Sequence, residues 1–434
     1  MRSWVRGMVL ALLALAGCQT GVGAPNDGQP PTQEFVVWQF SEFGGLPEVL
    51  PFQAGARPAR GQAFADPVYN TQVVRVTDKA ADGYSSPGLE NEYARFSPEN
   101  ADGTRVLLRG TDGVWFMYSW PGHENLGQVQ IDNPDMEPRW DPTDPNVFRY
   151  VDGPALREYR INTGQSTVIH DFSQDSPQCA VARSRYEGDS SGDARYWCFM
   201  LQDENWAVLS VVCYDRQADA IVGRLDNPEA AIDNVSMSMN GQHCIVVWDT
   251  DPATPPSAFS RDFGTRIELP DAPGHADFAL TADGHEVYVY QNIHTDWIAM
   301  ADLDTGAETN LVSIPFADNP DIGLHISGNC IATPGWVLVS TYGAATQAQS
   351  WMDQSLFFVQ LTVNPIIWRV AQTNCLQSPG DERDYFAEAF AAVNRAGTRV
   401  WWGSNWNVPD GPNIETYVAE LPANWPEQVL AAAP

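Results

Sequence analysis

The sequence predicts an all-β protein with the architecture of a seven-bladed β-propeller, with six or eight blades as the alternatives. One phrase recurs about seven times: an apolar stretch, a turn carrying Gly or Asn, and a second, more apolar stretch, as in residues 280–284 before 287–290. The copies lie roughly 40–60 residues apart, which is the spacing of propeller blades. The strand signals are short, rich in β-branched and aromatic residues, and bounded by Gly, Asp, Asn and Pro turns.

Each copy of the phrase is assigned to one blade. The predicted blades span residues 90–132, 135–173, 178–226, 232–270, 275–315, 324–373 and 385–422. The last copy lacks an outer strand, and an additional strand signal lies ahead of the first copy, at residues 69–77. Pairing these two would close the ring and remove both sheet edges.

This closure makes residues 36–424 a single predicted propeller domain, followed by a C-terminal tail at residues 425–434. Outside the extreme N-terminus, the stretch around residues 425–433 is the one part of the chain with a helical pattern.

The N-terminus has the pattern of an export signal. Arg2 and Arg6 precede an apolar stretch at residues 8–15, which is too short to span a membrane as a helix. The ending Leu-Ala-Gly-Cys resembles a bacterial lipoprotein box, which implies cleavage before Cys18 and lipidation of its thiol; an ordinary export signal is the alternative. Residues 1–18 are therefore assigned as the signal, and residues 19–35 as a flexible tether because they are rich in Gly, Pro, Asn and Gln.

The residue after the cysteine is Gln19 and not Asp. By the same resemblance, the protein is expected to be an outer-membrane lipoprotein of the bacterial cell envelope, facing either the periplasm or the exterior. We expect it to contact the membrane only through this lipid anchor and to be a monomer.

The charge balance excludes one class of partner. The chain carries 55 acidic and 24 basic residues, for a net charge of -31. Nucleic acid is not expected as a partner, because phosphate binding needs clustered cations.

Six cysteines follow Cys18, and an even count in an exported chain favours disulfides. We expect a Cys330–Cys375 bond, because both residues are assigned to blade entrances in neighbouring repeats. The remaining four are open between disulfides and buried thiols: Cys179, Cys198, Cys213 and Cys244.

The first strand of each blade begins at one end of the central channel, so residues just before or within these strands should converge on one funnel. The residues at these positions are Glu90, Glu92, Glu137, Arg139, Asp233, Asn234, His275, Asp277, His325 and Glu388. Such a ring suits cation binding or acid/base work on a polar substrate. Simple hydration of the channel mouth is the alternative.

Particular roles follow from residue type. His275, which follows Gly274 at a blade start, is the candidate base near neutral pH, with Arg139 and Asp277 as its catalytic partners. Substrate-binding roles are assigned to Glu92, Glu137, Asp233, Asn405 and Trp406. Trp406 is expected in a loop that reaches the funnel and stacks on a sugar ring, with a role as a loop anchor as the alternative.

Over roughly residues 64–422 the chain resembles the TolB-like propellers, and among them the oligogalacturonate-lyase type. Two segments carry the resemblance: residues 140–145 with 152–161, and Gly274-His-Ala-Asp-Phe with the turn at 282–284. The alignment places either His275 or Asp277 on the catalytic His of that family.

The same resemblance implies a manganese-like divalent metal bound through several His and a Gln; calcium is the alternative metal, and the absence of any cofactor is the other possibility. His325 matches one ligand. The family has a His-Pro-His phrase before its last repeat turn, where this chain reads Glu388-Ala389-Phe390. Glu388 is therefore the second candidate ligand, whereas Phe390 has no ligating atom.

Two functions are carried forward. In the first, the protein is a lyase acting on uronate-containing oligosaccharides, in which a metal neutralises the substrate carboxylate and His275 or His325 removes the adjacent proton. In the second, it is a non-catalytic propeller that binds a glycan or a protein partner in the envelope. The acidic composition argues against the first and the resemblance favours it.

Overall fold

The computed structural model describes residues 36–39, 47–52, 55–250, 254–270, 273–377, 382–408 and 413–433. The chain divides into two compact units, residues 1–32 and 33–434, and every described residue belongs to the second. The predicted signal, Cys18 and the whole of the tether at 19–35 lie outside the described residues. No helix in the described ranges is long and apolar enough to cross a membrane.

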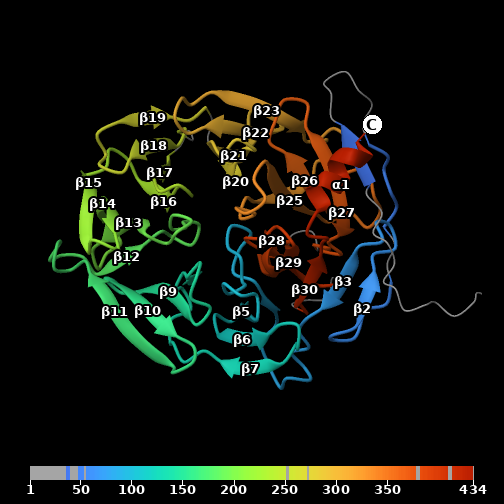
Figure 1. Cartoon of the computed structure of the whole chain (residues 1–434), viewed down its shortest axis with the longest axis horizontal. Helices are drawn as coiled ribbons and strands as arrows, with labels where there is room; N and C mark the ends of the chain where they lie inside the picture. Colours follow the sequence, from blue (N-terminus) through green and yellow to red (C-terminus); the bar gives the residue numbers. More distant parts are fainter. Residues whose placement is uncertain are drawn as a thin grey trace, which may run out of the picture. The chain divides into compact units, whose positions relative to one another are not determined.

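The described residues form seven antiparallel sheets arranged in a ring, which confirms the predicted seven-bladed propeller (Figure 1). The first three blades contain β4 (Leu89–Glu90), β5 (Arg105–Gly110), β6 (Trp115–Ser119) and β7 (Asn125–Gln128); β8 (Arg139–Trp140), β9 (Val147–Asp152), β10 (Ala155–Arg160) and β11 (Gln165–Asp171); and β12 (Val181–Arg183), β13 (Tyr196–Gln202), β14 (Val208–Asp215) and β15 (Ala220–Asp226).

The fourth and fifth blades have the same four-stranded plan. They contain β16 (Ile232–Met237), β17 (His243–Trp248), β18 (Ser257–Ser260) and β19 (Arg266–Glu268), and β20 (Pro273–Leu280), β21 (Glu286–Asn292), β22 (Trp297–Asp302) and β23 (Glu308–Ser313). In Figure 1 the first strand of each of these blades lies nearest the centre of the ring and the fourth lies outermost.

The last two blades contain strands from both ends of the described chain. The sixth joins β24 (Gly323–Ser327), β25 (Trp336–Tyr342), β26 (Ser355–Gln360) and β27 (Ile366–Gln372) to β1 (Val36–Gln39). The seventh follows the short 3-10 helix η1 (Glu382–Ala387) and joins β28 (Ala392–Val393), β29 (Arg399–Ser404) and β30 (Glu415–Glu420) to β3 (Gln72–Arg75) and β2 (Ala63–Ala65).

The predicted closure of the ring is confirmed. Strand β3 lies within the strand signal at 69–77 and pairs antiparallel with β30, with Val73 opposite Ala419 and Arg75 opposite Tyr417. Strand β3 thus supplies the outer partner that the last repeat lacks, and β30 has no free edge.

Burial follows the position of a strand in its blade. The middle strands are buried on both faces because each sheet is packed between two others, as in β25, where six of seven residues are buried. An outer strand such as β11 contains no buried residue. This is why the second stretch of each sequence repeat is the more apolar.

Seven clusters of buried apolar residues fill the spaces between neighbouring blades. The cluster at the closure joins Val418 and Trp401 of the last blade to Val106 and Leu108 of the first. A partly buried polar contact crosses the same interface: Arg399 binds the carboxylate of Glu99 through Nε and Nη2, both at 2.7 Å. Paired hydrogen bonds of this geometry satisfy the buried charge and hold the orientation of the two blades.

A helix is found where the sequence has its C-terminal helical pattern: α1 (Trp425–Ala432). Its Trp425 is fully buried and packs against Trp336, Phe358 and Trp368 of the sixth blade. The indole Nε1 donates to the Gly397 carbonyl of the seventh blade at 2.8 Å. The helix therefore connects the two blades that contain the chain ends.

The predicted Cys330–Cys375 disulfide is wrong, since both residues are buried free thiols. Cys330 follows the end of β24 and Cys375 follows the end of β27, and these two strands run in opposite directions because three antiparallel pairings separate them. The two thiols consequently lie at opposite ends of the blade.

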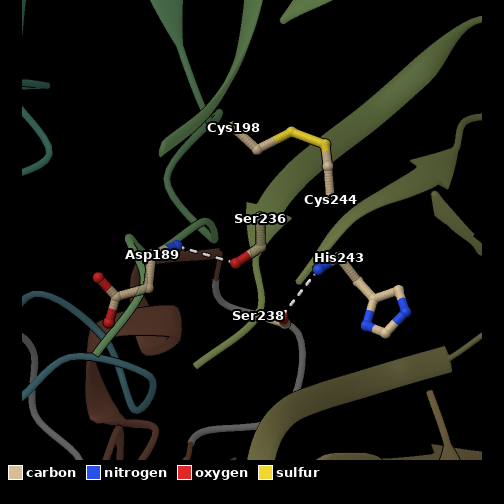
Figure 2. The surroundings of a disulfide bond; sticks show 6 residues. All are labelled: Asp189, Cys198, Ser236, Ser238, His243 and Cys244. Atoms are coloured by element: carbon tan, nitrogen blue, oxygen red, sulfur yellow. Dashed lines mark hydrogen bonds between the residues drawn. A yellow bond between two sulfur atoms is a disulfide. The ribbon is translucent and has the colours of Figure 1, made fainter. Parts of the chain in front are cut away.

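The disulfide is Cys198–Cys244, which links β13 of the third blade to β17 of the fourth. Figure 2 shows that two hydrogen bonds accompany it, Asp189 N to Ser236 Oγ at 2.9 Å and His243 N to Ser238 Oγ at 3.0 Å. The bond joins the second strands of two blades, which face each other across one of the apolar clusters.

Removing this cross-link should destabilise the propeller. The disulfide joins residues 46 apart, and the loss of a loop of this length raises the entropy of the unfolded chain by the equivalent of about 4 kcal/mol in the chain-entropy model. The Cys198→Ala/Cys244→Ala double variant should lose about this much free energy of unfolding, measured by denaturant titration. Cys213→Ala, which removes a buried thiol from the same cluster, is the matched control; an equal loss in both variants would contradict the prediction.

Candidate functional site

A cavity of about 470 Å³ opens at the end of the ring where the inner strands begin. This volume is in the range of small-molecule sites, roughly 300–1,000 Å³. Three of the predicted funnel residues line it: Glu90, Glu92 and Asp233. Carboxylates from the first and fourth blades therefore meet at one site, as the repeat pattern predicts.

The geometry of the strands explains which further residues reach the cavity. Glu90 at the start of the first blade is opposite Arg109 in the antiparallel register, so the end of β5 lies beside the start of β4. Arg109 consequently lines the cavity with Glu90. The ends of second strands, as well as the starts of first strands, contribute to this site.

Residues 184–188 form a bulge after β12 that brings Arg185, Tyr186 and Glu187 to the cavity. The backbone φ angles of Arg185 and Tyr186 are 67° and 69°, which bulky residues rarely adopt. The Glu137 carboxylate holds this conformation by accepting hydrogen bonds from Ser184 N at 2.9 Å and Tyr186 N at 2.8 Å. Glu137 is only 4% exposed, so it shapes the rim of the cavity and does not line it, contrary to its predicted contact with substrate.

Four of the five acidic residues that line the cavity are paired with an arginine, and Glu90 is the exception. The four pairs are Arg139–Glu92 at 2.9 Å, Arg95–Glu187 at 2.7 Å, Arg185–Asp233 at 3.3 Å and Arg109–Asp135 at 3.4 Å. The acidic character of the chain is therefore locally balanced at this site. Arg139, which was predicted as the cation of the funnel, is buried beneath Glu92 and also donates to the Gly188 carbonyl. The arginines that line the cavity directly are Arg109 and Arg185.

Burial shifts the protonation of the carboxyl groups. It raises the pKa of Glu92 to about 7, against the opposing charge of Arg139. It also raises the pKa of the fully enclosed Glu90 well above its usual range. Glu90 Oε2 and Asn91 Oδ1 are buried without a hydrogen-bond partner, and both residues line the cavity. Such groups mark a place where water or a ligand completes the hydrogen bonding.

Behind the cavity, the structure brings the predicted His275, His325 and Glu388 together. The Tyr93 hydroxyl, on the cavity wall, lies 3.2 Å from His275 Nδ1. The rings of His275 and His325 are 4.4 Å apart, and His325 Nε2 lies 2.8 Å from Glu388 Oε2. Gln377 Nε2 donates to the other oxygen of Glu388 at 3.2 Å. Three side chains, Tyr93, His275 and His325, thus connect the cavity to the largely buried carboxyl group of Glu388.

Burial controls the charge of these groups as well. It lowers the pKa of His275 and of His325 to about 3, so both imidazoles are neutral at neutral pH. It raises the pKa of Glu388 to about 7. It also raises the pKa of Tyr93 well above its usual range. Tyr93 is therefore protonated at rest and can donate its hydroxyl hydrogen to the neutral His275 Nδ1.

The structure offers a divalent metal few ligands at these residues. His325 Nε2 and Glu388 Oε2 are hydrogen-bonded to each other at 2.8 Å. The Phe390 ring packs 4.7 Å from the His325 ring, where only an apolar contact is available. Across the described ranges, no group of three or more His, Cys, Asp or Glu side chains is placed to hold a metal ion. The two predicted ligands, His325 and Glu388, therefore lie together, and in this structure they bond each other.

Asp277, which was predicted as catalytic, lies in a second cavity of about 60 Å³ together with Arg139. It accepts hydrogen bonds from Gly328 N at 2.7 Å and Phe278 N at 2.8 Å. Burial raises the pKa of Asp277 to about 7. Its contacts connect the fifth and sixth blades, and it does not line the larger cavity. Another predicted funnel residue, Asn234, donates its side-chain amide hydrogen to the carboxylate of Asp233 at 3.1 Å. It therefore supports a residue that lines the larger cavity.

The predicted sugar-stacking pair Asn405 and Trp406 is wrong. Trp406 is 7% exposed, stacks on Tyr417 at 4.8 Å and donates its Nε1 hydrogen to the Gly55 carbonyl. Asn405 is also buried and bonds both N and O of Leu376. The φ angle of Trp406 is 56°, which turns the chain inward at this point. Trp406 is therefore a loop anchor, the alternative role considered for it.

The sequence analysis missed several residues that line the cavity: Asn91, Tyr93, Arg109, Arg185, Tyr186, Glu187 and Tyr385. The sequence repeat could have predicted that Arg109 reaches the cavity, because the second strand of each blade ends beside the start of the first strand. The bulge that carries Arg185 to Glu187 had no sequence signal, since neither positive φ angle falls on a Gly.

Comparison with solved structures relates this architecture to known enzymes. An oligogalacturonate lyase in complex with manganese superposes with a TM-score of 0.58 at 16% identity, over 85% of this chain and 97% of the other. An oligogalacturonate lyase from Vibrio parahaemolyticus gives a TM-score of 0.58 at 13% identity, over 83% and 96% of the two chains. The fold is that of an oligogalacturonate-lyase-like propeller.

At these identities the likeness concerns the fold of the oligogalacturonate-lyase-like propeller alone. The comparisons with protein-family models and with curated proteins gave no match.

The buried Glu388 should make stability depend on pH. Its pKa rises from an ordinary value of 4.5 to about 7, so the folded state holds a proton that the unfolded state releases. This stabilisation is complete below pH 4.5 and is lost as the pH rises through about 7. Glu388→Gln, which stays neutral, should therefore gain roughly 3 kcal/mol relative to the unaltered protein between acidic and mildly alkaline pH.

Denaturant titrations of both proteins at several pH values measure this difference. Glu124→Gln, at an exposed glutamate, is the matched control. The same pH dependence of the free energy of unfolding in Glu388→Gln and Glu124→Gln would contradict the prediction.

Proposed function

We propose that the protein is a carbohydrate-active propeller which binds a uronate-containing oligosaccharide in the 470 Å³ cavity and cleaves it by elimination. The observation that supports this most is the Tyr93–His275 contact of 3.2 Å. It places a hydroxyl group at the cavity wall in contact with a neutral imidazole that can take up its proton.

In the proposed reaction, Tyr93 Oη removes the proton next to the substrate carboxyl group while its own proton passes to His275 Nδ1. The electron pair of the broken C–H bond forms the new C=C bond, and the C–O bond to the leaving sugar breaks. Glu92, whose pKa is about 7, lines the cavity and is the proposed donor of the proton that the leaving oxygen needs. His325 is 1% exposed, so we assign it to positioning of His275.

The substrate carboxylate needs a cationic partner, because charge on it opposes removal of the adjacent proton. Arg109 and Arg185 line the cavity, and their side chains are 28% and 38% exposed. Their present partners, Asp135 and Asp233, are still more exposed, at 46% and 48%. Exposed pairs of this kind contribute little to stability, so exchange of an Asp partner for a substrate carboxylate costs little.

A non-catalytic propeller that binds a glycan or protein partner in the envelope is the second candidate. The low pKa of about 3 at His275 favours it, because so weak a base holds a proton poorly. The paired charges of the cavity suit either function.

Incubation with galacturonate oligomers, with ultraviolet detection of unsaturated products, tests the proposal. The unaltered protein should form product, and Tyr93→Phe should lose about a hundredfold or more in kcat/KM because it removes the proton acceptor. His275→Gln should show a similar loss. Tyr196→Phe, on β13 outside the cavity, is the matched control and should retain activity.

The same assay with a chelator tests whether a metal contributes, and unchanged rates are expected. Absence of product together with absence of oligomer binding would overturn the proposal. Binding without product in every condition would favour the non-catalytic alternative.

We further propose that the protein is lipidated at Cys18 and resides as a monomer in the outer membrane of a bacterial envelope. The Leu-Ala-Gly-Cys ending and Gln19 support this. Metabolic labelling with a fatty acid should mark the full chain, and Cys18→Ala should abolish both the label and the membrane fraction. A Cys18→Ala protein that remains in the membrane fraction would contradict the anchor.

A further inference from the structure

A group of exposed side chains lies directly beside the cavity. Arg183 stacks over the ring of Trp206, with its Cζ 4.4 Å from the ring centroid, and lies 5.8 Å from the ring centroid of Tyr186. Tyr186 lines the cavity itself. These three residues, Arg183, Tyr186 and Trp206, form what we term the aromatic platform, which extends the cavity wall outward along the third blade.

The exposure of these rings distinguishes them from the other aromatic residues. Among the described residues, three aromatic side chains are strongly exposed: Trp206 at 57%, Tyr385 at 50% and Tyr186 at 40%. Tyr186 and Tyr385 line the cavity, and Trp206 reaches it through Arg183. Among the described residues, strongly exposed Trp and Tyr rings are therefore confined to one site, whereas exposed apolar residues without function are usually scattered.

The platform is rigid before any ligand arrives. Trp206 has a φ angle of 67°, a conformation that a bulky residue keeps only when its surroundings enforce it. Asp203 enforces it, since its carbonyl accepts from Trp206 N at 3.0 Å and its Oδ1 accepts from Ala207 N at 2.9 Å. The buried side chain of Gln202 links Arg183 to Trp206. It accepts a hydrogen bond from Arg183 Nε at 2.7 Å and donates one to the Trp206 carbonyl at 2.9 Å.

The charge of the platform is not balanced by the protein. Among the described residues, no carboxylate lies within ion-pair distance of Arg183, in contrast to Arg95, Arg109, Arg139 and Arg185 around the cavity. In a chain with a net charge of -31, a cation kept away from acidic groups is a selective binding group for an anion. Its planar guanidinium suits a carboxylate in particular.

We propose that the aromatic platform is a second sugar subsite, which binds a carboxylate-bearing unit of the same oligosaccharide chain whose neighbouring unit occupies the cavity. The apolar face of the sugar ring would lie on Trp206 or Tyr186, and Arg183 would bind the carboxylate. The subsite makes the protein select longer acidic oligomers over short ones. This inference rests on the proposed oligosaccharide function of the cavity.

Binding of galacturonate oligomers, measured by calorimetry, tests the subsite. The unaltered protein should bind the hexasaccharide more tightly than the disaccharide. Trp206→Ala should weaken hexasaccharide binding roughly tenfold, the contribution of one aromatic contact, and leave disaccharide binding unchanged. Arg183→Gln should reduce the preference for the free acid over the methyl-esterified hexasaccharide, and the part that remains is due to Arg109 and Arg185 in the cavity.

Ile293→Ala is the matched control, because Ile293 is 42% exposed and directly follows β21, the second strand of its blade, as the turn with Trp206 follows β13. It should bind both oligomers as the unaltered protein does. Equal affinity of the unaltered protein for the two oligomers, or an unchanged Trp206→Ala variant, would overturn the subsite and leave the proposed function standing. Failure of the unaltered protein to bind either oligomer would overturn both.

Discussion

Apolar packing between neighbouring blades is the interaction on which the rest of this structure depends. A single sheet of four short strands cannot cover its own two faces, so each blade buries them against the next. A cluster of buried residues fills each interface, and the last of them exists only because β3 pairs with β30. The closed ring therefore needs strands from both ends of the propeller, and the Glu99–Arg399 contact and α1 add further connections around the closure.

Closure also determines where chemistry can take place. The inner strands all begin at one end of the ring, and the polar groups at these positions meet around the cavity. Because the surrounding blades exclude water, the buried groups change their protonation: Glu92 and Glu388 have pKa values of about 7, and the His275 and His325 imidazoles are neutral. Carboxyl groups with pKa values near neutrality beside neutral imidazoles are suited to proton transfer.

The likeness to oligogalacturonate lyases extends over most of the chain, yet the interior of the site has its own chemistry. One solved lyase is a complex with manganese, whereas the described part of this chain contains no group of three or more His, Cys, Asp or Glu placed to hold a metal; Glu388 bonds His325 and the Phe390 ring packs against it. A propeller scaffold tolerates such exchange because its blades hold the site from outside and do not depend on the groups within it.

The sequence by itself determined the strands, the seven blades, the closing strand and the meeting of His275, His325 and Glu388, since these depend on a local pattern repeated at regular intervals. Only the tertiary structure decided which side chains face one another. The Cys198–Cys244 bond depends on contact between separate sheets, and the inward Trp406 and outward Tyr186 depend on positive φ angles at residues that are not glycine. A periodic pattern specifies which face of a strand is buried, whereas the direction of a loop side chain is decided by packing and hydrogen bonds with residues far away in the chain.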